Sequence, residues 1–242
     1  HSSTYTRNFF KQVIKYWLNE YKVDGYRFDL SKGFTPETYY TTDVTAWGNF
    51  NQSRIDILTD YYQTVKAANT NACLILEHFA DNSEETVLAN SGMLLWGNVN
   101  NAFSQSAMGL QSNSNFTYLT ATSRGWSNPR LVGYMESHDE ERISFRALNY
   151  GITEIKNDST LRMKQLAANA AMFLTAPGPK MIWQFGEIGY DISIDQNGRT
   201  GRKPIHWDYL ESPPRKALYE SYSKILNFRN QYPELFSAPS TW

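Results

Sequence analysis

The sequence is poor in cysteine and histidine, and it has no long apolar run. Its one cysteine, Cys73, excludes a disulfide within the chain. Because Cys73 precedes the apolar residues 74–76, we expect a buried and unreactive thiol there. No stretch approaches the ~20 consecutive apolar residues that a membrane-spanning helix needs, so the sequence predicts no membrane span.

The sequence also lacks an excess of positive charge. Lysine and arginine number 23 against 24 aspartates and glutamates, a formal net charge of -1. A nucleic-acid-binding domain normally shows a basic excess or a dense basic patch, so we expect no nucleic-acid partner. No signal peptide is visible, but the chain opens on His1-Ser2-Ser3 without Met. Secreted, cell-surface and cytoplasmic locations therefore all stay open.

The composition is that of a folded domain. The 242 residues, 41% hydrophobic and 19% charged, argue against disorder. The length lies near the about 250 residues of a (β/α) barrel. Aromatic residues reach 15%, which fits either an aromatic core or rings lining a sugar cleft, and composition does not separate these readings.

Helical and strand patterns alternate along the chain. Apolar residues at helical spacing predict helices over residues 8–22, 54–68, 100–110, 161–175 and 214–229. Short apolar runs predict strands over residues 23–29, 73–79, 93–96, 131–137 and 180–185. Residues 30–52 and 111–130 read as loops. This alternation predicts a parallel sheet in an α/β fold.

The strand candidates end in polar residues, which is where barrel enzymes carry their chemistry. We therefore expect a partial TIM (β/α)8 barrel, with residues 1–242 forming a single catalytic-barrel piece. Only five strands are visible where a complete barrel has eight. Open sheet edges would then favour pairing between copies, so we expect self-association of the chain.

Three acidic residues, Asp29, Glu77 and Asp139, end three of the strand candidates. Cleavage of a glycosidic bond needs two carboxyl groups, of which one attacks or activates water and the other protonates the leaving oxygen. Arg27 lies two positions before Asp29, so both side chains point to the same side of the strand. The guanidinium would keep Asp29 ionised and oriented, as a nucleophile requires. His138, just before Asp139, suits binding of sugar hydroxyls.

These segments carry a resemblance to one enzyme family. Residues 23–32 (Val-Asp-Gly-Tyr-Arg-Phe-Asp-Leu-Ser-Lys) resemble the second signature of the α-amylase family, glycoside hydrolase family 13. Residues 74–78 and 134–139 are similar to its third and fourth signatures, and residues 183–187 resemble its eighth strand. The resemblance implies a piece running from roughly the third to the eighth barrel helix, without the first strands and the C-terminal β-sandwich.

The resemblance also implies roles for the acidic residues. Asp29 would be the nucleophile, Glu77 the general acid/base and Asp139 the stabiliser of the transition state. Arg27 would orient the nucleophile, and His138 would bind hydroxyls of the reacting sugar.

Two further residues are assigned to the leaving-group side by the same resemblance. Lys32 would contact sugar there, and His78 would line that side as well. Many family members carry His directly after the position of Lys32, where this chain has Gly33. No metal or other cofactor is expected, because family calcium sites depend largely on an insertion that lies upstream.

The activity implied is that of a retaining α-glucan hydrolase, acting on starch-, glycogen- or pullulan-type polymers through a covalent glycosyl-enzyme. An α-glucan transglycosylase such as a branching enzyme would use the same catalytic residues and stays open. A metal-dependent barrel with carboxylate and His138 ligands, or a non-catalytic relative, is a weaker alternative: four histidines suit metal binding poorly, and no catalytic position is lost.

Overall fold

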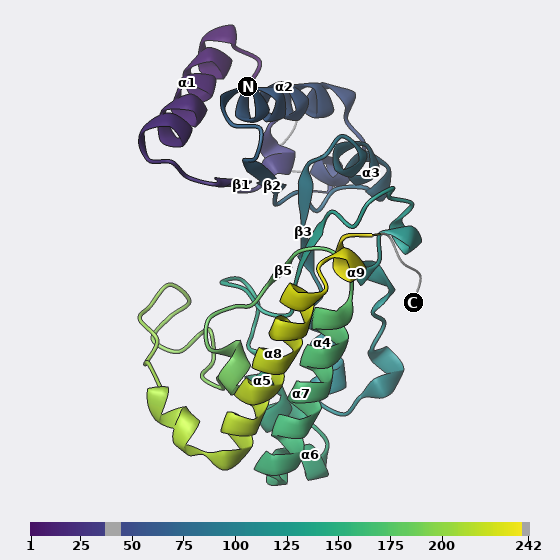
Figure 1. Ribbon diagram of the computed structural model, residues 1–242, viewed down its shortest axis with the longest axis vertical. Coiled ribbons are helices and arrows are strands. Elements are labelled where there is room, and N and C mark those ends of the chain that lie inside the picture. The colour runs from purple at the N-terminus through teal and green to yellow at the C-terminus, as the bar shows by residue number, and fades with distance from the viewer. Residues whose placement is uncertain (37–44, 239–242) are drawn as a thin grey trace. The chain divides into compact units, whose positions relative to one another are not determined.

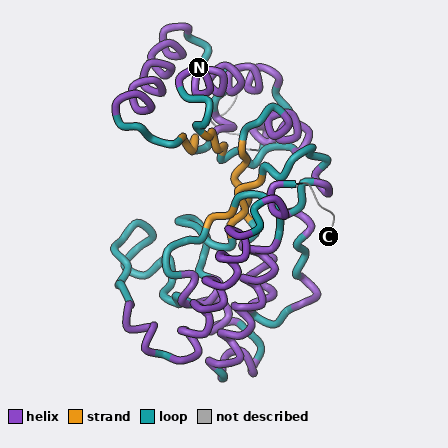
Figure 2. The backbone as a smooth tube through the Cα atoms, viewed as in Figure 1, coloured by secondary structure: helices purple, strands orange, loops and turns teal. Residues whose placement is uncertain are grey.

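Helices make up most of the regular secondary structure, and the strands between them are short (Figures 1 and 2). The computed structural model describes residues 1–36 and 45–238. The helices there are α1 (Thr4–Glu20), α2 (Gln52–Ala68), α3 (Asn82–Asn90), α4 (Asn100–Ala107), α5 (Ile143–Tyr150), α6 (Thr153–Asn157), α7 (Ser159–Thr175), α8 (Pro213–Gln231) and α9 (Glu234–Ser237). The strands are β1 (Gly25–Phe28), β2 (Cys73–Leu76), β3 (Leu94–Asn98), β4 (Leu131–Tyr134) and β5 (Lys180–Met181). Short 3-10 helices include η1 (Ser31–Gly33), η2 (Ala46–Gly48), η5 (Thr122–Arg124) and η6 (Gly186–Ile188).

The five strands follow one another in the sheet in chain order, β1-β2-β3-β4-β5. The pairs β1–β2, β2–β3 and β4–β5 are parallel. Parallel neighbours joined through helices are the arrangement that the alternating pattern predicts, so that prediction is confirmed.

The close start of β1 beside β2 depends on one glycine. Gly25 has φ +155, and a Cβ there would lie 2.2 Å from the carbonyl oxygen of Cys73. Any side chain at this position would separate the two strands at their first pair. Cys73 itself is exposed, so the expectation of a buried thiol was wrong: the residue opens the strand, and burial begins at Leu74.

The chain forms two compact units. The first comprises residues 1–96 and 124–132, and the second comprises residues 97–123 and 133–242. In the first unit α1 packs on α2. Its core includes Ile14, Leu58 and Tyr61, all at most 1% exposed.

In the second unit α4 packs against α5 and α7, and α7 packs along α8 (Figure 1). Phe103 of α4 meets Phe173 of α7 edge to face at 5.7 Å between ring centroids. Both rings are fully buried, so these two helices share one core.

Several elements differ from the sequence-based expectation. Strand β4 ends at Tyr134 and β5 at Met181, earlier than expected. Residues 183–187 are not a strand: Phe185 has a left-handed backbone (φ 67) and leads into η6. Helices α3, α5 and α6 were not expected. No helix of the described residues has the length and apolar character to cross a bilayer.

Candidate active site

Asp29 and Glu77 directly follow the neighbouring strands β1 and β2. The main-chain N–H of Glu77 donates to the carbonyl oxygen of Phe28 at 3.0 Å, which continues the ladder past both strands. The parallel register pairs Phe28 with Leu76, the residues just before the two acids. The pairing therefore brings both carboxylates to the carboxyl edge of the first unit, as the sequence predicts.

One guanidinium contacts both carboxylates. Nη1 of Arg27 donates to Oδ1 of Asp29 at 2.8 Å. Nη2 lies 2.8 Å from Oε1 of Glu77, a distance that forms an ion pair, although this nitrogen lacks the angles of a hydrogen bond. The guanidinium also lies 5.0 Å from the ring centroid of Trp96, within cation–π range. The side chain of Arg27 thus bridges the carboxylates of Asp29 and Glu77.

The two carboxylates differ sharply in access to solvent. The side chain of Asp29 is 76% exposed, whereas that of Glu77 is 12% exposed. A ligand can therefore reach Asp29 from solvent, while Glu77 is held in place by the protein around it.

Leu30 and Ser31 fix Glu77 from the side of β1. Leu30 has a left-handed backbone, with φ 44 and ψ 47, and its N–H donates to Oε2 of Glu77 at 2.8 Å. The N–H of Ser31 donates to the carbonyl oxygen of Glu77, also at 2.8 Å. A non-glycine residue in this conformation is strained, and such residues cluster at functional sites. Here the strained turn directs two N–H groups at one acidic residue.

The two residues expected on the leaving-group side lie in different environments. Lys32 is part of η1 and is half-buried. His78 has no exposed surface. Its Nδ1 lies 2.9 Å from Oγ of Ser31 and its Nε2 lies 2.7 Å from Oε1 of Glu84. The structure therefore does not place His78 where a sugar could touch it.

His138 and Asp139 lie together in the second unit, beyond the carboxyl end of β4. Nε2 of His138 is 3.2 Å from Oδ2 of Asp139. Nη2 of Arg199 is 3.5 Å from Oδ1 of Asp139 and donates to its carbonyl oxygen. About half of each of these three side chains is exposed. Arg199 was missed by sequence reasoning because it lies in a segment without helix or strand pattern.

A pocket of about 390 Å³ lies beside His138, within the second unit. Aromatic side chains and cations line much of it: Trp183, Phe185, Tyr190, Arg142, Arg199 and Lys203. The ring of Trp183 lies 6.2 Å from that of His138. Aromatic faces and hydrogen-bond donors are the groups that bind a pyranose, so the lining suits a sugar.

A buried ion pair joins Glu136, two residues before His138, to Arg142. Glu136 accepts from Nη1 of Arg142 at 2.9 Å and from the N–H of Ile143 at 2.8 Å. Burial raises the pKa of Glu136, although Arg142 opposes that shift. This pair ties the segment after β4 to the start of α5.

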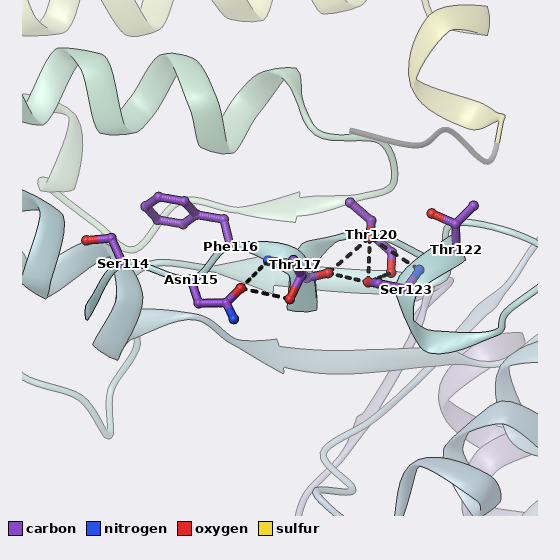
Figure 3. Close-up of a pocket in the computed structure, with 7 residues that line it drawn as sticks. All are labelled: Ser114, Asn115, Phe116, Thr117, Thr120, Thr122 and Ser123. Atoms are coloured by element: carbon purple, nitrogen blue, oxygen red, sulfur yellow. Dashed lines mark hydrogen bonds between the residues drawn. The ribbon is translucent and has the colours of Figure 1, made fainter. Parts of the chain in front are cut away.

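A second pocket, of about 620 Å³, precedes β4 in the chain and is lined by residues between Ser114 and Ser123 (Figure 3). Its polar groups bond one another, as the dashed lines show: Asn115 accepts from Thr117, and the hydroxyls of Thr120 and Ser123 are 2.5 Å apart. No ionisable side chain lines it. It offers no groups for acid–base chemistry, so it is not the candidate active site.

Metal ligands do not gather in the described part of the chain. Within residues 1–36 and 45–238, no three His, Cys, Asp or Glu side chains are placed to hold one ion.

Comparison with known families gives one match over most of the chain. The model of the family described as "Alpha amylase, catalytic domain" matches residues 2–212. No curated protein matches the chain.

Solved structures with the same fold are also found. They include Eubacterium rectale Amy13B, at 16% identity and TM-score 0.64 over 99% of this chain and 49% of that one. The type III pullulan hydrolase from Thermococcus kodakarensis has 16% identity and TM-score 0.67 over 98% and 38%. A pullulanase complexed with maltotriose from Anoxybacillus sp. LM18-11 has 12% identity and TM-score 0.62 over 91% and 32%.

The likeness shows the fold, which is part of a TIM barrel. The chain spans about half or less of the length of each of these structures.

Proposed function

Because the chain belongs to the α-amylase catalytic-domain family, we propose that it carries the site of a retaining α-glucan hydrolase. The observation that carries the proposal is the contact of Arg27 with both Asp29 and Glu77. A retaining glycosidase needs two neighbouring carboxyl groups about 5–5.5 Å apart, one to bond the sugar and one to move the proton. Two of the similar structures are a pullulan hydrolase and a pullulanase bound to maltotriose, which favours α-glucan polymers as substrate and hydrolysis over transfer.

The proposed reaction has two steps. Asp29 attacks the anomeric carbon while Glu77 protonates the departing glycosidic oxygen, which gives a sugar ester on Asp29. Glu77, now ionised, takes a proton from water, and that water attacks the same carbon and releases Asp29. Arg27 contacts both carboxylates and so orients attacker and proton donor together. Lys32 is proposed to contact sugar on the leaving-group side.

Asp139 and His138 receive their roles from the family resemblance. Asp139 would stabilise positive charge at the anomeric carbon, and His138 would bind sugar hydroxyls. Their mutual contact and the aromatic pocket beside His138 support those roles.

The test is to trap the covalent intermediate in the intact protein with a fluorinated α-glucosyl fluoride. Trypsin cuts after Arg27 and Lys32, so the label should appear on the peptide of residues 28–32, whose one acidic side chain is Asp29. Asp29→Asn should abolish labelling and lower turnover on starch by several orders of magnitude, because an amide cannot act as the nucleophile. A label on another peptide, or normal turnover of the variant, would remove Asp29 from the mechanism.

The same protein preparation separates hydrolysis from transfer. Hydrolysis releases reducing sugars from starch whether or not an acceptor glucan is added. If the added acceptor becomes lengthened or branched while few reducing ends appear, the protein is a transglycosylase instead.

A further inference from the structure

A set of buried side chains joins Glu77, the candidate acid/base, to helices α2 and α3 of the first unit. It consists of Ser31, His78, Glu84 and Arg54, which we call the buried relay. Each of these four residues is at most 1% exposed. None of them has surface with which to contact a sugar, so any role in the reaction must be exerted through neighbouring residues, of which Glu77 is the candidate acid/base.

Ser31 is the end of the relay that contacts Glu77. Its main-chain N–H donates to the carbonyl oxygen of Glu77 at 2.8 Å, and its hydroxyl donates to the same oxygen at 2.9 Å. The preceding residue, Leu30, donates its N–H to the carboxylate of Glu77. Residues 30 and 31 therefore hold both the main chain and the side chain of Glu77.

His78 connects Ser31 to Glu84. One ring nitrogen lies 2.9 Å from the hydroxyl of Ser31, and the other lies 2.7 Å from Oε1 of Glu84. With both nitrogens bonded, the ring orientation is set from its two ends. The position of the Ser31 hydroxyl then depends on Glu84.

Glu84 and Arg54 make the far end rigid. Glu84 receives four bonds: from Nε and Nη2 of Arg54 at 2.6 Å, from His78 at 2.7 Å and from the N–H of Asn51 at 2.8 Å. Arg54 uses its remaining donors on the carbonyl oxygens of Lys32, Trp47 and Asn49 at 2.8–2.9 Å. All five N–H donors of this guanidinium are thereby engaged.

Burying the ion pair of Glu84 and Arg54 costs free energy, so we expect the relay to serve a function besides stability. Two buried charges lose hydration that their attraction only partly returns, and apolar side chains of similar size often stabilise a core equally well. A rigid polar framework does, however, hold a reacting group in one geometry, which an apolar core does less well. The relay also ties η1 and η2, the turns after β1, to helix α3 through these bonds.

We propose that the buried relay positions the carboxyl group of Glu77 for proton transfer to the leaving oxygen, with Ser31 as the residue that transmits its hold. The inference rests on the proposed function, in which Glu77 is the acid/base. Ser31, His78, Glu84 and Arg54 are positioning residues, not catalytic ones.

The expected effect of losing the hold is selective. A misplaced acid slows departure of a poor leaving group, such as a sugar hydroxyl, but it hardly affects fluoride, which needs little protonation. A residue that only stabilised the fold would lower activity on both substrates together. The contrast between the two substrates therefore separates positioning from stability.

The experiment compares kcat/KM for a maltooligosaccharide and for α-glucosyl fluoride in the intact protein. Ser31→Ala should lose about tenfold to a hundredfold on the oligosaccharide, the range expected for a displaced reacting group, and at least tenfold less on the fluoride. Glu77→Gln, which removes the acid itself, serves as the reference and should show the largest loss of kcat/KM on the oligosaccharide relative to the fluoride. Ser91→Ala is the matched control, because the exposed hydroxyl of Ser91, the residue after α3, bonds the carbonyl oxygen of Val87 and lies outside the buried relay.

His78→Asn serves as a second variant if Ser31→Ala fails to fold, and it should show the same selective loss. Equal losses on both substrates, or no loss on either, in a folded variant would overturn the inference while leaving the proposed function intact. A wild-type protein inactive on both substrates would overturn the proposed function, and this inference with it.

Discussion

Arg27 shows how a single side chain can organise a site. Its planar guanidinium presents several donors in fixed directions, so one residue can contact Asp29 through Nη1 and Glu77 through Nη2. A lysine at this position would offer one compact charge on a flexible stem and could not hold two carboxylates apart in a defined way. The geometry of both acids thus depends on the type of cation between them.

Glu84 should make the stability of the protein sensitive to acid. Burial opposes its ionisation, but the hydrogen bonds and the charge interactions with His78 and Arg54 together outweigh burial and lower the pKa of Glu84 below its ordinary value of 4.5. A carboxyl whose pKa is lower in the folded state stabilises the protein fully above 4.5, and this contribution is lost as the pH falls through the folded pKa. We expect the melting temperature of wild type to fall on acidification through this window.

Glu84→Gln tests that expectation. The variant should be about 3–5 kcal/mol less stable at neutral pH, because it leaves the buried charge of Arg54 unpaired. Its melting temperature should change less than that of wild type below pH 4.5. Glu20→Gln, at an exposed position, is the control and should follow wild type. If the melting temperatures of wild type and Glu84→Gln fell equally as the pH is lowered, Glu84 would not be the source of the acid sensitivity.

At the scale of single residues, the sequence predicted the strand-end acids but not their surroundings. Glu77 follows the apolar residues 74–76, and Asp29 follows the short strand segment 23–28, so both strand ends were readable from the sequence. The segments after β1 and β2 each contain a residue with a left-handed backbone, Leu30 and Phe79, and no apolar pattern marks these positions. The family resemblance assigned His78 to the sugar, and its buried partner Glu84, 2.7 Å away, was missed.

At the scale of elements, the long helices and the short helix α4 were predicted, whereas the short helices α3, α5 and α6 were not. The helices α2 and α7 both have 17 residues, enough for the helical period to repeat several times. The unexpected helices α3 and α6 have 9 and 5 residues, which leaves room for few repeats. Helix α3 begins with a side-chain cap, in which Asp81 accepts from the N–H of Ser83. Helix α6 has no such cap, and helices this short depend on tertiary contacts more than on a long apolar face.

Asp158 joins two helices and offers a test at this scale. It follows the last residue of α6, and its main-chain N–H donates to the carbonyl oxygen of Glu154 within that helix. Its side chain accepts from the N–H groups of Thr160 and Leu161, at 2.8 and 3.0 Å, at the start of α7. Asp158→Ala should therefore cost about 1 kcal/mol of unfolding free energy in urea denaturation, a typical value for loss of an N-cap.

Asp158→Ser is the matched variant, because serine caps a helix nearly as well. It should retain most of the stability that Asp158→Ala loses. If both variants lose the same amount, the side-chain cap does not contribute and the effect comes from charge alone.

At the scale of the whole molecule, the sequence predicted the class of fold, because alternating strands and helices leave a parallel sheet as the simplest solution. It did not predict how the chain divides into two compact units, since β3 and β4 each contribute residues to both. Such a division depends on which contacts form between segments far apart in the sequence, and the local hydrophobic pattern does not indicate those contacts. That residues 1–242 act as a single barrel piece stays a prediction.

The edge of the sheet provides a prediction at the same scale. Strand β1 is the first in the strand order, and within the described residues no strand pairs with it opposite β2. The carbonyl oxygens of Asp24 and Phe28 accept from Cys73 and Glu77 on the β2 side, so the polar main-chain groups of Gly25 and Arg27 face away from β2. Unpaired groups in a row form a template for another strand.

The 242-residue chain should therefore associate with itself, and light scattering after gel filtration should give a mass above 27.9 kDa that rises with concentration. A constant mass of 27.9 kDa at every concentration would show that the chain is a monomer and that this edge does not pair with a second copy.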